Sequence, residues 1–281
     1  MQRGRAMFRA ERRGRRAALA VLIAAAAASL VPTIYMVDIS FRDSTQSFAP
    51  VLIAPHPILR NYAAVLATGG LGRFFLNSLI VAAGSVALTL VAATLLSFAI
   101  ERLKIRFGRI ILLIVLSALL LPLASLLIPI TVLLSRGGLT NTWLGLIGPT
   151  AAIGIPFATV ILKEAMAAIP DELEEAATLD GASSLTVLVR IVTPLTRSAL
   201  IVVAIWQFLY SWNEFFLALV IMTKNAYKTL PLAPLYYQGP FMTDPGKLFA
   251  ILTLIAIVPM LFYVLLQRWF VGGLMAGGVK G

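Results

Sequence analysis

Long apolar runs separated by short polar segments dominate this sequence. Six charge-poor runs cover residues 17–39, 74–100, 110–135, 143–162, 198–223 and 248–267. Each is about as long as the ~20 residues that an α-helix needs to cross ~30 Å of hydrocarbon, or longer. The runs are continuous, whereas the strands of a membrane barrel would alternate apolar and polar residues over ~10 positions. The pattern predicts an all-α polytopic membrane protein with six transmembrane helices, forming one transmembrane domain over residues 17–270.

Composition supports the same class. Of 281 residues, 60% are hydrophobic and 12% are charged, and the mean hydropathy is +0.94, which is more apolar surface than a soluble domain can bury. A net charge of +11 would suggest nucleic-acid binding in a soluble protein, but here the basic residues cluster beside the apolar runs, which is a topology signal. The chain has no cysteine and one histidine, His56, which we interpret as a turn residue. We expect no nucleic-acid partner, metal or cofactor for this chain.

The distribution of Lys and Arg indicates the orientation. With the N-terminus in the cytoplasm, 16 of the 23 Lys and Arg residues fall on the inside, so both termini are expected there. Residues 1–16 then form a basic tail beside anionic lipid, and residues 271–281 form a cytoplasmic C-terminal tail. A cleaved signal peptide also begins with basic residues and an apolar run. This run continues for about 23 residues, however, so we expect it to be retained as a span.

The segment between the fourth and fifth runs, residues 163–197, predicts a helix, a tight turn and a second helix. Pro170 suits the first turn of a helix, and the acidic residues that follow it favour the positive end of the helix dipole. Gly181 supplies the stop, because glycine after a helix tolerates the left-handed conformation, and one of the two following serines can cap the next helix. A surface helix on the membrane is the alternative, but residues 170–180 carry no Lys or Arg to meet anionic lipid. We interpret the segment as a docking loop for a partner protein.

The same segment carries a family signature. Its pattern of Glu-Ala-Ala, three residues, Gly, nine residues and Ile-x-Leu-Pro resembles the cytoplasmic loop of membrane subunits of binding-protein-dependent ABC importers. Thr193 stands where the pattern usually has Leu. The candidate coupling residues are Glu174, Glu175, Ala176, Ala177, Asp180, Gly181, Ile191 and Pro194. Two further segments, Trp212 to Phe215 and the tail from Gln267 to Gly281, resemble the carbohydrate branch that contains the second maltose importer subunit.

This resemblance implies a fold, a set of partners and a place in the cell. The fold would be that of a type I ABC importer permease in the bacterial inner membrane. The chain would form half of a translocation pathway beside a second, similar membrane subunit. Two ATPase subunits would bind ATP and Mg, and an extracytoplasmic binding protein would deliver a carbohydrate, so this chain would not itself be an enzyme. Glu175 would pair with a basic residue of an ATPase. The tail residues that would reach between the ATPase subunits are Gly277, Gly278, Val279, Lys280 and Gly281.

Glu214 is the one acidic residue deep inside a predicted span, and Trp212 and Asn213 stand beside it. An intramembrane carboxylate usually faces a cavity or a partner. A place on the translocation pathway, a position near the external end of the span and a contact with the second membrane subunit all stay open. The external loops 40–73 and 224–247 are either plain connections or contacts for the binding protein.

Two other classes of protein compete with the importer. A membrane-embedded enzyme would use Glu214 as an acid or base, but no second acidic residue lies deep in a span to assist it. A stand-alone ion-coupled secondary transporter would titrate Glu214. Such transporters often carry internal repeats, and the two halves of this sequence show no convincing one.

Overall fold

The computed structural model describes residues 2–47, 53–67, 70–238 and 244–278. Every regular element among these residues is a helix, so the predicted all-α class is confirmed for them. The chain divides into two units, which are described separately. The first comprises Met1–Thr68 and Pro234–Leu254, and the second comprises Gly69–Ala233 and Ile255–Gly281.

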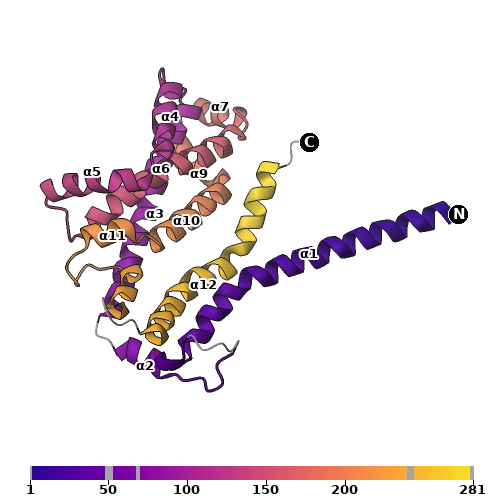
Figure 1. Cartoon of the computed structure of the whole chain (residues 1–281). Helices are drawn as coiled ribbons and strands as arrows, with labels where there is room; N and C mark the ends of the chain where they lie inside the picture. Colours follow the sequence, from indigo (N-terminus) through magenta and orange to yellow (C-terminus); the bar gives the residue numbers. More distant parts are fainter. Residues whose placement is uncertain (1, 48–52, 68–69, 239–243, 279–281) are drawn as a thin grey trace. The chain divides into compact units, whose positions relative to one another are not determined.

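The helices follow the apolar runs in chain order (Figure 1). The first unit contains α1 (Gln2–Ser40), η1 (Ser44–Gln46) and α2 (Arg60–Ala67), while η4 (Leu230–Tyr237) and α12 (Pro245–Gly278) each continue across the boundary between the units. The second unit contains α3 (Leu71–Glu101), α4 (Gly108–Ser117), η2 (Ala118–Leu120), α5 (Leu123–Arg136), α6 (Trp143–Ala167), α7 (Glu172–Leu179), α8 (Ser184–Val187), η3 (Leu188–Val192), α9 (Thr193–Leu195), α10 (Arg197–Trp212) and α11 (Phe216–Ile221).

In the described part of the chain, four helices are long and apolar enough to cross a membrane: Ala18–Ser40, Leu71–Glu101, Trp143–Ala167 and Pro245–Leu266. Two bent pairs raise the number to as many as six. They are Gly108–Leu120 with Leu123–Arg136, bent by 105°, and Ser184–Leu195 with Arg197–Trp212, bent by 78°. The chain is therefore a multi-pass membrane protein, while six spans with both termini inside stay a prediction.

The third apolar run, 110–135, does not form the single helix that its length predicts. It breaks at Leu121, which has φ −84° and ψ 121°, and at Pro122, with φ −65° and ψ 131°. Proline has no N–H to continue the helix and pushes the residue before it into the extended region. The fifth run, 198–223, breaks as well: α10 ends at Trp212 and α11 begins only at Phe216.

The ends of the chain are more helical than the predicted tails. Helix α1 already begins at Gln2, so it includes the basic segment, and α12 runs through Gly278. Two of the candidate tail residues, Gly277 and Gly278, thus belong to the end of α12. Val279, Lys280 and Gly281 lie outside the described residues.

The loop after α1 in the first unit is held by buried polar contacts. Arg42, which is 2% exposed, forms an ion pair with Asp38, whose other carboxylate oxygen accepts a hydrogen bond from the Ala54 N–H at 2.7 Å. The Asn61 side-chain amide donates to the Ser40 and Arg42 carbonyls at 3.0 and 2.7 Å. On the surface, hydrogen bonds from the Thr45 N–H and hydroxyl hold the pKa of Asp43 below its ordinary value. The loop is therefore folded locally and includes the short helix α2.

The second unit is built around α3 and α6, which pack side by side and run in the same direction. The Thr89 hydroxyl donates to the Ala151 carbonyl at 3.3 Å, and two turns further on Ser97 donates to Thr159 at 3.0 Å. Helix α10 packs against both. One core cluster joins these three helices to the segment after α7; its buried members are Ala93, Phe98, Ala158, Leu162, Met166, Ile169, Val187, Leu188, Val192 and Val203.

Candidate coupling surface and translocation pathway

Helix α7 begins and ends where its sequence predicts, within two residues. Asp171 is the N-cap and the first turn carries Glu172, Glu174 and Glu175, which suits the positive end of the helix dipole. Pro170 lies one residue before the N-cap and not in the first turn, where the motif suggested it. Its carbonyl accepts a long 3.4 Å hydrogen bond from Leu173, which starts the turn.

The turn after α7 depends on a left-handed glycine. Gly181 has φ +84°, and the Ala182 N–H reaches back to the Ala177 carbonyl at 2.9 Å, as in a Schellman cap. A Cβ at Gly181 would meet no atom within 4 Å, so the backbone conformation and not a lack of space at the Cβ favours glycine there. Ser183 then caps α8 by accepting a hydrogen bond from the Thr186 N–H at 3.3 Å. The predicted helix, turn and helix are all present.

The end of the motif, at Ile191 and Pro194, forms the helical turns that lead into α10. Ile191 lies in a π-helical turn, where the Thr193 N–H bonds to the Leu188 carbonyl. Pro194 follows in the first turn of α9 and supplies no N–H for a regular α-helical bond. After Thr196 the chain turns into α10, and the two helical segments differ in direction by 78°.

One side of the α7 to α9 segment packs on the spans and the other is open. Ala177 and Ala182 lie against the core cluster of α3, α6 and α10. Glu175 and Ala176 are exposed, and Leu179 is 89% exposed. Leu173 and Leu185 are exposed as well, at 46% and 66%, and several exposed apolar side chains on one segment favour a docking surface more than a single one does. We name eight of the exposed residues of this segment the coupling surface: Glu172, Leu173, Glu175, Ala176, Leu179, Asp180, Gly181 and Leu185.

Arg102 ties this segment to α3, a contact that the sequence patterns did not reveal. Its side chain is 6% exposed, and its Nε lies 2.5 Å from a carboxylate oxygen of Glu174. A terminal nitrogen lies 2.9 Å from Asp171. Glu174, one of the predicted coupling residues, is 18% exposed and pairs with Arg102 of its own chain. In the sequence, Arg102 is one of several basic residues after an apolar run, a pattern that indicates topology and does not identify its partners.

The second candidate site is the break between α10 and α11. Glu214 is 7% exposed, and its carboxylate accepts a hydrogen bond from the Leu217 N–H at 2.5 Å, which caps α11. The exposed Asn213 side chain donates to the Leu209 carbonyl at 2.8 Å. Polar side chains that bond to nearby backbone compete with the helix ladder, which explains why the run breaks here. Helix breaks in transporters often accompany substrate or ion sites.

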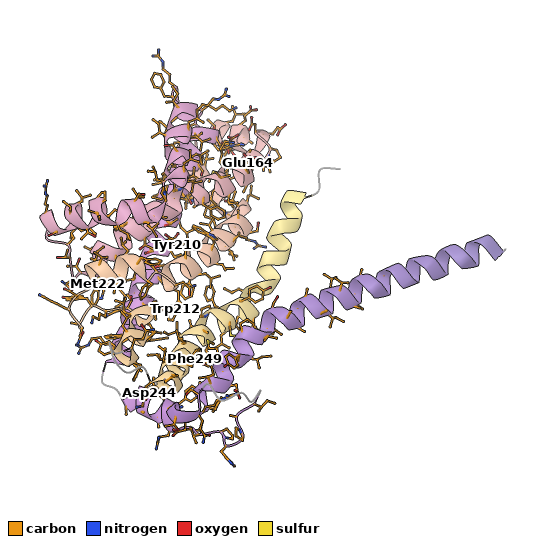
Figure 2. The ribbon with its side chains drawn as sticks, in the orientation of Figure 1. Glu164, Tyr210, Trp212, Met222, Asp244 and Phe249 are labelled. Carbon is orange, nitrogen blue, oxygen red and sulfur yellow. The ribbon has the colours of Figure 1, made fainter. Side chains whose placement is uncertain are left out.

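A cavity of about 450 Å³ opens beside this break. Asn213 and Glu214 line it together with four aromatic residues, of which Trp206 and Tyr210 stack their rings at 5.5 Å between centroids. Trp212 is fully buried and stacks instead on Phe208 at 5.7 Å. The aromatic residues of α10 thus form two pairs at i, i+4 spacing and do not scatter around the helix; Figure 2 labels one member of each. Of the three predicted pathway residues, the structure brings Asn213 and Glu214 to the cavity but not Trp212.

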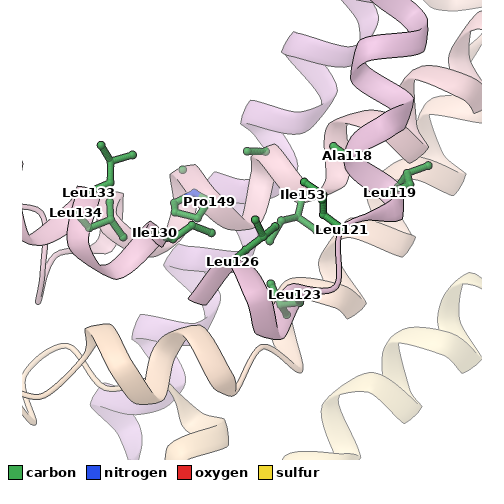
Figure 3. A pocket seen from close by; sticks show the side chains of 12 residues that line it. Ala118, Leu119, Leu121, Leu123, Leu126, Ile130, Leu133, Leu134, Pro149 and Ile153 are labelled. Carbon is green, nitrogen blue, oxygen red and sulfur yellow. The ribbon is translucent and has the colours of Figure 1, made fainter. Parts of the chain in front are cut away.

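A second cavity, of about 530 Å³, lies between the bent α4–α5 pair and α6 (Figure 3). Aliphatic residues line it, including Leu119, Leu126 and Ile153. No ionisable side chain faces it among its lining residues, so it provides no group for specific recognition of a polar solute.

Comparisons with known proteins identify the class of membrane protein. Residues 85–275 match the family described as binding-protein-dependent transport system inner membrane component. A putative ABC transporter permease protein of Caldicellulosiruptor sp. is 34% identical over 254 residues, covering 89% of this chain and 92% of its own. The sulfoquinovosyl glycerol transport system permease protein SmoH of Agrobacterium fabrum is 32% identical, with coverages of 90% and 89%. The trehalose/maltose transport system permease protein MalG of Thermococcus litoralis is 30% identical, with coverages of 90% and 92%.

The fold has a solved counterpart. A chain of the crystal structure of a bacterial ABC transporter involved in the import of the acidic polysaccharide alginate superposes with a TM-score of 0.79 at 20% identity, covering 90% of this chain and 95% of that one. The family match covers well over half of the sequence, and it includes the whole segment that carries the Glu175 to Pro194 motif. The chain therefore belongs to the inner membrane components of binding-protein-dependent transport systems, as that motif predicted.

Proposed function

We propose that this chain is the permease subunit of an ATP-driven carbohydrate importer and that its coupling surface docks into an ATPase subunit. The coupling surface carries the proposal: an acidic and apolar helix, closed at its C-terminal end by the turn at Gly181, is exposed on one side and packed on the membrane helices by the other. Such a helix can be moved as a rigid body, and the attached spans move with it. The relatives named for sulfoquinovosyl glycerol and for trehalose and maltose support a carbohydrate as the solute.

The assembly follows from the coupling surface, the one docking segment that we identify among the described residues. Because one coupling surface engages one ATPase, a machine with two ATPase subunits needs a second, similar membrane subunit. ATP and Mg would be held by the ATPases, and an extracytoplasmic binding protein would deliver the solute. This arrangement places the chain in the inner membrane with both termini and α7 in the cytoplasm.

Within the membrane, we assign this chain's half of the pathway to the 450 Å³ cavity beside the α10–α11 break. Stacked aromatic rings offer apolar faces to a sugar ring, and Asn213 and Glu214 offer hydrogen-bonding groups to its hydroxyls. A cavity with a few polar groups on an otherwise apolar wall suits a solute that must bind weakly and leave.

The test of docking is a charge reversal at Glu175. The complex is purified from the native host through the wild-type chain, through Glu175→Lys and through the control Glu164→Lys. Glu164 is 70% exposed at the end of α6, outside the coupling surface. We expect wild type and control to retain the ATPase, the second permease and the binding protein, and Glu175→Lys to lose mainly the ATPase. Full retention of the ATPase by Glu175→Lys would refute docking at this surface, and uptake that needs no ATP would favour the ion-coupled transporter.

A further inference from the structure

We propose that Arg102 is a positioning residue that makes α3 move together with the coupling helix α7. The inference rests on the proposed docking of the coupling surface to an ATPase, and it adds a third span to the elements that the ATPase moves. Chain connectivity already joins α7 to α6 before it and to α10 after it. Helix α3 has no such covalent link to α7, because more than sixty residues separate Glu101 from Glu172.

The contacts of Arg102 converge on the segment that leads from α6 into α7. Besides Glu174 and Asp171, the guanidinium donates to the carbonyls of Ile169 at 3.1 Å and Met166 at 3.4 Å. These two carbonyls belong to the end of α6 and the residues just after it. One side chain thus fastens the last residues of α3 to the end of α6 and to the first turn of α7.

The geometry explains why an arginine occupies this position. A guanidinium presents five N–H donors in a rigid plane, so it can serve two carboxylates and two carbonyls at once, which the compact ammonium of lysine cannot do in the same geometry. The Arg102 side chain is 6% exposed and that of Glu174 is 18% exposed, so water has little access to this contact, whereas Asp171 is 61% exposed. Separating the largely buried pair of Arg102 and Glu174 would leave two charges poorly compensated, so this linkage resists separation.

The backbone around Arg102 transmits this linkage to α3. Arg102 is the C-cap of α3, and its N–H bonds to the Phe98 carbonyl at 3.0 Å. Phe98 is 5% exposed and belongs to the core cluster shared with α6 and α10. A displacement of Glu174 therefore acts on the last turn of α3 through the guanidinium of Arg102, and not only through side-chain packing.

The test measures solute uptake and ATP hydrolysis by the reconstituted complex, with the ratio of the two as the readout. The variants are Arg102→Gln, Arg102→Lys and Glu174→Gln. The control is Lys104→Gln, since that ammonium is 74% exposed and stands 3.7 Å from Asp171, beside the same loop. We expect Arg102→Gln and Glu174→Gln to keep the ATPase bound and to lower uptake per ATP at least about fivefold, the lower end of typical couplings between sites. The uptake per ATP of Arg102→Lys should lie between that of these two variants and that of wild type, and Lys104→Gln should have the wild-type value.

Two results would overturn the inference. One is wild-type uptake per ATP in both Arg102→Gln and Glu174→Gln. The other is an equal loss in Lys104→Gln, which would indicate a general effect of loop charge. Should Arg102→Gln fail to assemble, Glu174→Gln decides alone, because it keeps the arginine and removes only the partner charge. Failure of the docking proposal is separate: there Glu175→Lys keeps the ATPase, whereas here the ATPase stays bound and only the uptake per ATP changes.

Discussion

Leu179 offers the sharpest test of docking, because it contributes almost nothing to the fold of its own chain. It is the last residue of α7 and is 89% exposed. Replacing it by alanine removes no internal contact of consequence and suits a helix at least as well as leucine does. A loss of ATPase binding in Leu179→Ala would therefore report on the interface and not on folding.

The expected loss of binding free energy in Leu179→Ala follows from the apolar area that Leu179 exposes. Fully burying a leucine side chain contributes about 1.5–3 kcal/mol, and alanine retains a part of this. If Leu179 fills a pocket of the ATPase, Leu179→Ala should weaken binding by about 2 kcal/mol. Since each 1.4 kcal/mol corresponds to a tenfold change, the dissociation constant should rise about 30-fold.

The assay titrates purified ATPase onto the permease pair in lipid nanodiscs and measures Kd for wild type, Leu179→Ala and Leu120→Ala. Leu120 is 83% exposed at the bend between α4 and α5, so it is a leucine of matched exposure outside the coupling surface. We expect Leu120→Ala to bind as wild type. An unchanged Kd for Leu179→Ala would show that α7 does not insert this side chain into the ATPase, and the docking reasoning would fail.

Three further predictions follow from local geometry. At Gly181 the left-handed backbone costs an L-residue about 1–2 kcal/mol, and less for Asn. Gly181→Val should therefore lower uptake per ATP, while Gly181→Asn should retain most of it. Equal uptake per ATP by wild type and both variants would contradict a rigid turn. Glu214→Leu leaves the Leu217 N–H without its acceptor and should lower the Tm of the complex by removing a cap that contributes about 1 kcal/mol, whereas Glu214→Gln should keep Tm and reveal in uptake whether the charge contacts solute. A Cβ at Gly154 would lie 1.9 Å from the Gln207 side-chain oxygen, so Gly154→Ala should lower Tm through overpacking of about 1–3 kcal/mol; adding Gln207→Ala should restore it, and a Tm unaffected by Gly154→Ala would refute the close approach.

The local structure of the coupling segment was predictable because its signals are short-range. A dipole-matched first turn, a left-handed Gly181 and a capping Ser183 each act within a few residues, and the structure places all three as expected. The all-α membrane class was predictable for a related reason, since the length of an apolar run decides whether a helix can cross the bilayer.

Features that depend on residues far apart in the sequence were not predictable. The pairing of Arg102 with Glu174 joins positions 72 residues apart, and no local pattern distinguishes that arginine from its basic neighbours. The breaks at Pro122 and Asn213 have local causes instead, but they fall within runs that hydropathy alone treats as continuous. The missing N–H of Pro122 and the polar side chains of Asn213 and Glu214 interrupt the helical hydrogen bonds, but they hardly lower the mean hydropathy of the two runs.

The two candidate sites are mechanically connected by one helix. Helix α10 has 16 residues, which is about 24 Å at ~1.5 Å per residue. Its N-terminal end follows the 78° bend after the coupling motif, and its C-terminal end is the break that presents Asn213 and Glu214 to the cavity. A rigid helix turns a small tilt at one end into a displacement at the other, and the break frees α11 from following it. Since α3 and α6 pack on α10 and Arg102 fastens α3 to α7, docking at the coupling surface can change the shape of the cavity without any direct contact between the ATPase and the solute.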